Sequence, residues 1–164
     1  TVVAACPRGG FLLDQFNTVN YNNNNGTVAW KSAWSESFDN NAPSSGRIRI
    51  TANELRLSDA PDSGQIPALA RQANLTGAAT AVLSFDYRTA LTVDSTDQVR
   101  VQISSNGGST WTTLRTFSGQ SSGTASIDIS AYRSANVVIR FQVSALYNIS
   151  DEYFAVDNVR IGCN

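Results

Sequence analysis

The sequence predicts an all-β protein built from two packed antiparallel sheets, and three observations point to it. Apolar and polar residues alternate along short segments from about residue 46 to the C-terminus, which is the pattern of half-buried strands. Turn residues separate these segments at short intervals, as in sandwiches and barrels. No window keeps an apolar period of 3.6 residues over three turns, which argues against a helical domain. About eight to ten strands would accommodate residues 1–164 as a single module.

The predicted strands begin with residues 47–50 and 54–57, which read as a hairpin around Ala52 and Asn53. Residues 65–74 fit either a helical turn or a strand, and residues 129–134 fit one short helical turn. The loop at 22–26 (NNNNG) suits left-handed backbone conformations. Further strands are expected at residues 81–87, 99–104, 111–117, 125–129, 137–143 and 153–161.

One hairpin has a recognisable turn sequence, SSNGGSTW at residues 104–111. It has the layout of an Asp-box with Asn106 in place of the aspartate, and Asn-Gly between alternating segments favours a tight turn. We expect the Asn106 side chain to hydrogen-bond within the turn and Trp111 to pack beneath it. Because this motif occurs in many unrelated β proteins, it predicts a stable hairpin and not a ligand site.

Composition excludes several classes of function. The net charge is −1, and the basic residues are scattered arginines with Lys31 as the sole lysine. A nucleic-acid surface needs clustered cations, so nucleic acid is not an expected partner. No run approaches the roughly 18 apolar residues of a membrane span.

Catalysis is not expected either. The chain has no histidine, which removes the commonest general base. A retaining glycosidase needs two carboxyl groups about 5 Å apart, and no strand carries a close pair of glutamates; the three are Glu36, Glu54 and Glu152. Lys31 and Ser32 are adjacent, so on a strand they would point to opposite faces and could not form a Ser–Lys pair.

The two cysteines, Cys6 and Cys163, lie near the two ends of the sequence. Terminal strands of a sandwich can lie side by side, so a disulfide between them is geometrically natural and would imply an oxidising, extracellular compartment. The alternative is that residues 3–6 (VAAC) belong to a lipid-attachment signal.

Four segments carry a family resemblance: AVLSFDYRT at 81–89, VRVQISSNGGSTWTTL at 99–114, IDISAYRSANVVIRF at 127–141 and FAVDNVRI at 154–161. They resemble a secreted bacterial module similar to MAM domains and to jelly-roll carbohydrate-binding modules of surface adhesins, peptidases and glycan-degrading enzymes. The resemblance covers nearly the whole chain. It implies a jelly-roll sandwich, concanavalin-like or galactose-binding-like, that acts as a monomeric, non-catalytic accessory module.

The resemblance also implies a structural Ca²⁺ where the N-terminal segment meets the last strand. Asp157 matches the terminal-strand aspartate of such modules, and Asp14 or Glu36 would be its partner from the N-terminal end. Loop oxygens, including that of Asn25, would complete a shell of hard oxygen ligands.

A glycan is the leading expected ligand, because sugars stack on aromatic faces beside amide, carboxylate and guanidinium groups. The candidate ligand-binding residues are Tyr21, Trp34, Asp39, Arg88 and Tyr147. The alternative function is a structural or adhesive spacer that docks on its own parent protein, a secreted protease or hydrolase, and binds no glycan.

Overall fold

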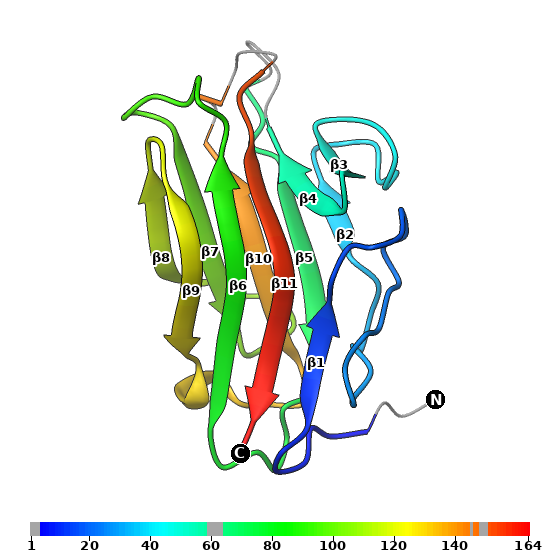
Figure 1. The fold of residues 1–164 in the computed structure, drawn as a ribbon. Helices are drawn as coiled ribbons and strands as arrows, with labels where there is room; N and C mark the ends of the chain where they lie inside the picture. The colour runs from blue at the N-terminus through cyan, green and yellow to red at the C-terminus, as the bar shows by residue number, and fades with distance from the viewer. Residues whose placement is uncertain (1–3, 59–63, 145, 148–150) are drawn as a thin grey trace.

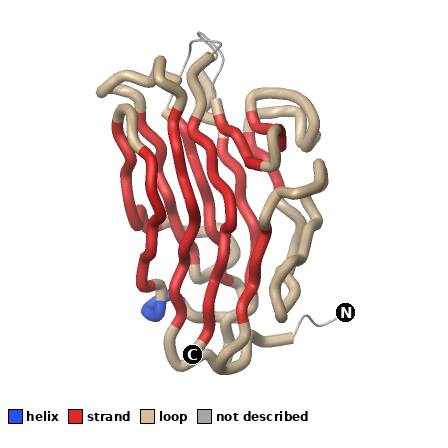
Figure 2. Tube along the Cα trace, in the orientation of Figure 1, coloured by secondary structure: helices blue, strands red, loops and turns tan. Residues whose placement is uncertain are grey.

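The computed structural model describes residues 4–58, 64–144, 146–147 and 151–164, and these form strands and a single helical turn (Figures 1 and 2). The strands are β1 (Phe11–Asp14), β2 (Ser35–Ser37), β3 (Ile48–Thr51), β4 (Glu54–Leu57), β5 (Ala68–Ala73), β6 (Ala81–Thr89), β7 (Gln98–Ser104), β8 (Thr112–Ser118), β9 (Ser122–Asp128), β10 (Val137–Val143) and β11 (Phe154–Cys163). The helical turn is the 3₁₀ helix η1 (Ser130–Tyr132).

The strands form two antiparallel sheets that pack face to face, as predicted. Sheet A has the order β3-β4-β11-β6-β9, and β1 also pairs with β11. Sheet B has the order β2-β5-β10-β7-β8. Figure 1 views the molecule from the outside of sheet A, with sheet B behind it. The two outer faces therefore point in opposite directions, and each is a separate surface for a ligand.

Inward side chains of the two sheets meet in an aromatic and aliphatic core. Phe85 of β6 and Phe141 of β10 lie edge to face with ring centroids 5.2 Å apart, which is a favoured arrangement of aromatic pairs. Phe117 of β8 contacts Phe85 at a centroid distance of 6.0 Å. The predicted alternation is confirmed along β3, where Ile48 and Ile50 are buried and Arg49 is exposed.

The structure resolves the ambiguous segments and adds two strands that the sequence did not predict. Most of residues 65–74 becomes the strand β5, and residues 129–134 hold only η1. The additional strands, β1 and β2, are three or four residues long. Strands this short contain too few residues to show a period of two, which is why the pattern missed them.

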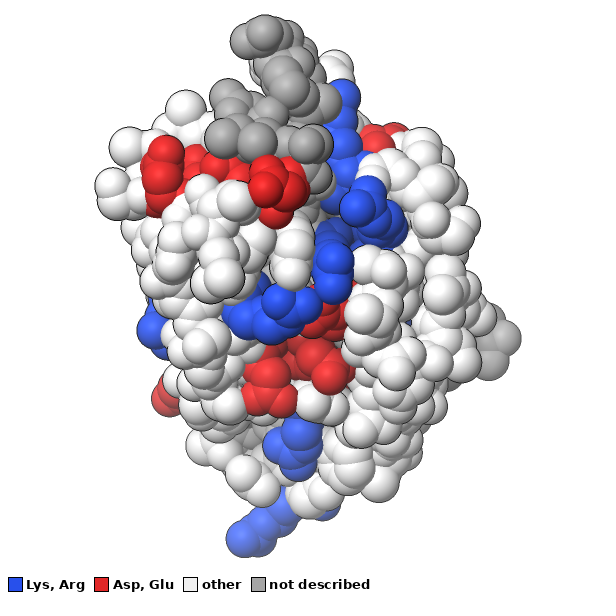
Figure 3. Space-filling model, turned by 45° about the horizontal axis from the view of Figure 1, so that its top comes forward, with Lys and Arg blue, Asp and Glu red and all other residues white. Residues whose placement is uncertain are grey.

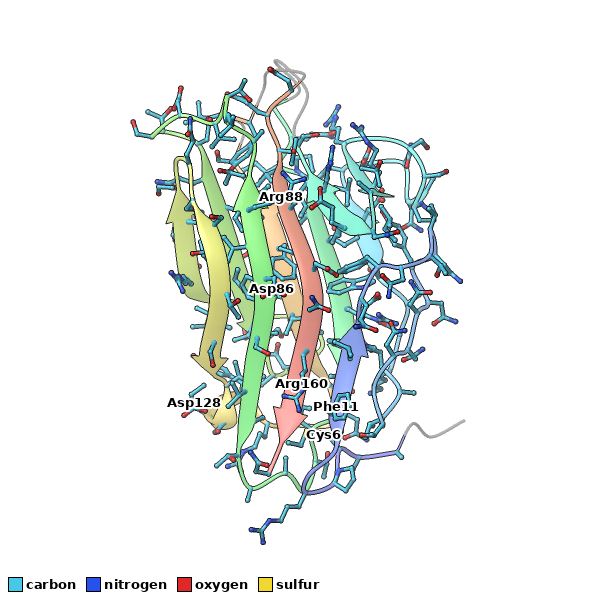
Figure 4. The ribbon with its side chains drawn as sticks, viewed as in Figure 1. Cys6, Phe11, Asp86, Arg88, Asp128 and Arg160 are labelled. Atoms are coloured by element: carbon cyan, nitrogen blue, oxygen red, sulfur yellow. A yellow bond between two sulfur atoms is a disulfide. The ribbon has the colours of Figure 1, made fainter. Side chains whose placement is uncertain are left out.

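The disulfide between Cys6 and Cys163 is confirmed, with the two Cα atoms 6.1 Å apart. It forms because β1 pairs with the last residues of β11, with Leu12 opposite Ile161. This pairing brings both ends of the described chain to one end of the sandwich. Figure 4 shows Cys6 there, beside Phe11 and the end of β11. No helix in the described residues is long and apolar enough to cross a membrane.

Candidate functional site

A groove of about 540 Å³ crosses the outer face of sheet B. Its volume falls in the range of pockets that bind small molecules, roughly 300–1,000 Å³. The groove is hollow because its floor carries the short side chains of Ala70 on β5 and Val138 on β10, next to larger residues at its margins. The other lining residues include Gln72, Ser32, Ser35 and Asn41 on the β2 side, and Gly107, Gly108 and Trp111 on the β7–β8 side.

Trp111 is positioned by the hairpin that joins β7 to β8. The Asn106 Oδ1 atom accepts hydrogen bonds from Ser104 Oγ (2.8 Å) and from the Thr110 backbone N–H (3.0 Å), as the turn sequence predicts. Gly107 and Gly108 have φ values of 74° and 93°, which glycine adopts without strain. The Trp111 ring lies against Gly108 of this turn, as predicted, and is half-buried at the edge of the groove.

An arginine from the middle of sheet B covers one face of the Trp111 ring. The guanidinium carbon of Arg140 on β10 lies 3.9 Å from the ring centroid, a close cation–π contact. Two of the arginine's nitrogens, Nε and Nη2, donate to Gln102 Oε1 on β7 at 2.9 and 2.7 Å. Burial lowers the pKa of Arg140 from its ordinary value. The indole is thus held rigidly, which reduces the entropy lost when a ligand stacks on it.

The β2 side of the groove is fixed by short hydrogen bonds to β5. The Ser32 Oγ atom accepts the Gln72 N–H at 3.0 Å, and the Lys31 N–H donates to the Gln72 carbonyl at 2.9 Å. Lys31 Nζ reaches across to β10 and donates to the Ala135 carbonyl (2.8 Å) and to Asn136 Oδ1 (2.6 Å). Loop residues on the β2 side of the groove are therefore tied by hydrogen bonds to β5 and to the segment before β10, and this side presents amide and hydroxyl groups.

A smaller hollow, about 210 Å³, lies on the outer face of sheet A. Glu54, Asp86, Arg88 and Asp157 line it, and Figure 3 shows acidic side chains gathered on this face beside a band of basic ones. Figure 4 shows Asp86 and Arg88 along β6. Burial and then the charges of Asp86 and Glu54 raise the pKa of Asp157.

The charged side chains of this smaller hollow bind one another. Arg88 Nε donates to Glu54 Oε2 at 2.9 Å, and Arg88 Nη1 donates to the Tyr153 hydroxyl at 2.8 Å. Arg56 Nε lies 2.7 Å from Glu54 Oε1, so the two arginines share this glutamate. The Arg56 guanidinium carbon lies 4.2 Å from the centroid of the Tyr153 ring. Because these donors and acceptors are already paired, the groove on sheet B is the stronger candidate site.

The structure does not bring the predicted ligand-binding residues together. Tyr21, Trp34 and Tyr147 are 6%, 2% and 1% exposed, so none offers a ring face at the surface; this correction follows from their packing in the core. Asp39 accepts the Ile48 N–H at 2.7 Å and holds a loop. Trp34 contributes to the lining of the groove on sheet B but is only 2% exposed, and Arg88 lies at the smaller hollow on sheet A.

The buried aromatic side chains have internal partners. The Tyr21 hydroxyl donates to Glu36 and to the Ile48 carbonyl, and Trp34 Nε1 donates to Asp14 Oδ2 at 2.9 Å. Burial raises the pKa of both Tyr21 and Tyr147. Each polar tip is therefore satisfied inside the protein, as buried Tyr and Trp require.

The residues expected to hold calcium do not fit a calcium site. Glu36 accepts from Tyr21 and the Asn41 N–H, Asn25 Oδ1 accepts the Gln15 N–H, and Asp157 accepts the Asn158 N–H. In the described part of the chain, no three His, Cys, Asp or Glu side chains are grouped to hold a metal ion.

Asp14 is fully buried and paired with an arginine in place of a metal. Arg71 Nη1 donates to Asp14 Oδ2 at 2.6 Å. The same guanidinium donates to the carbonyls of Asn23 (2.7 Å) and Ser32 (2.9 Å), so it is hydrogen-bonded to one carboxylate and two backbone oxygens. Burial lowers the pKa of Arg71 to about 10 despite the neighbouring Asp14 charge. Asp14 thus has a side-chain cation, Arg71, as its counter-charge.

Sequence reasoning missed Trp111 as a binding residue. The available signal was its place directly after a glycine turn and before the edge strand β8, where no further strand covers it. The aromatic residues of the core do not follow a glycine turn next to an edge strand. Residue type alone does not distinguish them from Trp111.

No protein-family model matches the sequence, and no curated protein is detectably similar to it. Solved structures are similar in fold. A variant of the family 29 carbohydrate-binding module CBM29-2 has a TM-score of 0.57 at 13% identity, covering 92% of this chain and 89% of that one. The Caldicellulosiruptor saccharolyticus module CBM27-1, solved with mannohexaose, has a TM-score of 0.59 at 15% identity, covering 93% and 96%. Another CBM29-2 variant, solved with cellulohexaose, has a TM-score of 0.55 at 12% identity, covering 92% and 90%. At these identities the similarity establishes the jelly-roll sandwich fold, as the resemblance implied.

Proposed function

We propose that this protein is a non-catalytic, extracellular carbohydrate-binding module whose ligand lies in the groove on the outer face of sheet B. The observation that carries the proposal is the half-buried Trp111, which Arg140 holds rigid at the edge of a groove lined by amides and hydroxyls. A pyranose ring has one apolar face that stacks on an indole, and its hydroxyls need neighbouring polar partners.

The fold supports the same proposal by analogy. The neighbours named above are carbohydrate-binding modules, and two of them were solved with mannohexaose or cellulohexaose. Fold similarity alone does not assign function, so the argument depends on the groove itself. The disulfide between Cys6 and Cys163 is in keeping with an oxidising, extracellular location.

The test is a glycan screen followed by calorimetry with the wild type, Trp111→Ala and Tyr153→Ala. Tyr153 is a matched control because it also stacks on arginines, but on sheet A. We expect Trp111→Ala to weaken binding by about 5- to 150-fold, the equivalent of the 1–3 kcal/mol that a ring stacked on an aromatic side chain contributes. Tyr153→Ala should retain the affinity of the wild type.

Two results would count against the proposal. Loss of binding in Tyr153→Ala but not in Trp111→Ala would move the site to sheet A. Absence of binding to every glycan would instead favour a spacer that docks on its parent protein. Near-ultraviolet circular dichroism of both variants would establish that each remains folded.

A further inference from the structure

The strands of sheet B carry almost no acidic residues. Among β2, β5, β7, β8 and β10, the only Asp or Glu is Glu36 on β2. Glu36 does not point outward, because the residue opposite it on β5 is the buried Leu69. Its carboxylate accepts a hydrogen bond from the Tyr21 hydroxyl. The outer face of sheet B is therefore neutral except for its cations.

Lys31 and Arg140 lie beside the groove, and Arg100 lies farther along sheet B at a separate small hollow with Gln98 and Gln142. None of these three cations pairs with a carboxylate of the described residues, whereas Arg71, which also lines the groove, is buried and paired with Asp14. Arg140 bonds the neutral amide of Gln102. Lys31 bonds the Ala135 carbonyl and Asn136 Oδ1. Arg100 on β7 is exposed, and its side chain makes no hydrogen bond or ion pair with the described residues.

Two arginines of sheet A, Arg56 and Arg88, differ from these cations in having a carboxylate partner. Arg56 and Arg88 share Glu54, and Asp86 and Asp157 lie in the same hollow. The chain as a whole is close to neutral, with a net charge of −1. What distinguishes the outer face of sheet B is that its strands combine cations with no outward acidic side chain, whereas the outer face of sheet A carries Glu54, Asp86 and Asp157.

The three cations form a row that begins beside the groove and continues beyond it along sheet B. Arg140 is opposite Gln102, and Arg100 is opposite Gln142, so the two arginines are diagonal neighbours on adjacent strands. Diagonal pairs are about 7–8 Å apart, within reach of one extended ligand. Lys31 lies at the other end, beside Asn136, which also accepts the Gly107 N–H. From Asn136 to Gln142 the row follows β10 for about 20 Å.

We propose that this groove selects an acidic polysaccharide, one whose sugars bear carboxylate or sulfate groups. This inference rests on the proposed carbohydrate-binding function and specifies its ligand class. Uncharged sugars gain little from an unpaired ammonium or guanidinium beyond ordinary hydrogen bonds. An anionic sugar gains charge-assisted hydrogen bonds, and the planar guanidinium of Arg100 can bind a carboxylate with two parallel N–H groups.

The experiment compares ligands that differ only in charge. Polygalacturonate and its methyl ester share a backbone but only the first is anionic, and carrageenan and chemically desulfated carrageenan form a similar pair for sulfate. Affinity is measured for each at low and at physiological salt. We expect at least one acidic member to bind about tenfold more tightly than its neutral counterpart, with the difference shrinking as salt is added.

Arg100→Gln tests the cation that has no partner in the protein, and Arg49→Gln is its matched control. Arg49 is an exposed arginine on β3 of sheet A, hydrogen-bonded only to the Gly46 carbonyl. Arg100→Gln should lose most of the preference for the acidic ligand over its neutral counterpart, while Arg49→Gln should behave as the wild type.

The two proposals fail in different ways. If neutral glycans bind in a Trp111-dependent manner and no acidic member is preferred, the ligand class is wrong but the carbohydrate-binding function stands. If nothing binds, the function itself fails. An acidic preference that survives in Arg100→Gln but disappears in Arg49→Gln would place the anion on sheet A and overturn the inference.

Discussion

Arg71 illustrates how one side chain organises the N-terminal third of the chain. It lies on β5 with its side chain fully buried, and its guanidinium binds Asp14 on β1 and the carbonyls of Asn23 and Ser32 in the loops between β1 and β2. It also lies 4.8 Å from the centroid of the Trp30 ring. A long segment with little regular structure is thus fastened to sheet B by one cation.

Replacing Arg71 with an uncharged residue should lower the free energy of unfolding substantially. Arg71→Met leaves the Asp14 carboxylate buried without a counter-charge, and removal of one partner of a buried pair costs about 3–5 kcal/mol. We expect a loss of that size in the free energy of unfolding, measured by urea denaturation. The double variant Asp14→Asn with Arg71→Met should recover part of the loss, because it removes the orphaned charge.

The control for this prediction is Arg49→Met, at an exposed site where a change within about 0.5 kcal/mol is expected. Chelation provides a second check. If Arg71 supplies the internal cation, EDTA should leave the melting temperature unchanged. A melting temperature that falls in EDTA and recovers with added Ca²⁺ would show that a metal site exists after all.

Among the elements, β11 has the largest role in sheet A. It pairs with β1, β4 and β6, and its register with β6 shifts between Asp157 and Arg160, where Asn158 adopts a φ of 50°. This irregularity places the carboxylate of Asp157 in the same hollow as Asp86 and Glu54. Burial and like charge together raise the pKa of Asp157.

The raised pKa gives a pH-dependent prediction. A folded-state pKa above the unfolded value means that folding favours the protonated acid, so stability from this group is present at low pH and is lost as pH rises above about 4. Asp157→Asn keeps the group neutral. The variant should melt at a higher temperature than the wild type at pH 7 and at nearly the same temperature at pH 3.

A matched control lies at the end of β9. Hydrogen bonds from Ser130 lower the pKa of Asp128, so the shift has the opposite sign. Asp128→Asn should not gain stability at pH 7 relative to pH 3. A pH-independent effect of Asp157→Asn would mean that the carboxylate is solvated as it is in the unfolded chain.

At the scale of the whole molecule, contacts between the N-terminal and C-terminal segments of the chain hold the two ends of the fold together. The disulfide joins residues 157 positions apart, and backbone hydrogen bonds accompany it, from Gly9 N–H to the Cys163 carbonyl (2.7 Å) and from Cys163 N–H to the Gly10 carbonyl (2.9 Å). A cross-link over so long a loop greatly restricts the unfolded chain.

Removing the cross-link should therefore lower stability without changing the fold. The double variant Cys6→Ser with Cys163→Ser should lose about 2–5 kcal/mol in the free energy of unfolding, measured by urea denaturation. Wild type treated with a reductant should show the same loss, and the variant should not respond to reductant. Equal stability of oxidised and reduced wild type would contradict the prediction.

The sequence predicted well what depends on local pattern. Alternation located β3, β4 and β6 to β11, because a strand that separates core from solvent must alternate. The turn at Asn106 followed from the hydrogen-bonding capacity of a short amide side chain and the conformational freedom of glycine. The disulfide followed from the position of two cysteines near the ends of a sandwich.

Tertiary structure alone decided which polar and aromatic groups are available. Trp34 and Trp111 are the same residue type near a strand and both line the groove, yet Trp34 is buried and bonded to Asp14 while the Trp111 ring is partly exposed. Likewise, Asp14 could be read as a calcium ligand until Arg71, 57 positions away, was found on its carboxylate. Periodicity reports only on neighbours along the chain, whereas exposure and charge pairing depend on residues that folding brings together from distant strands.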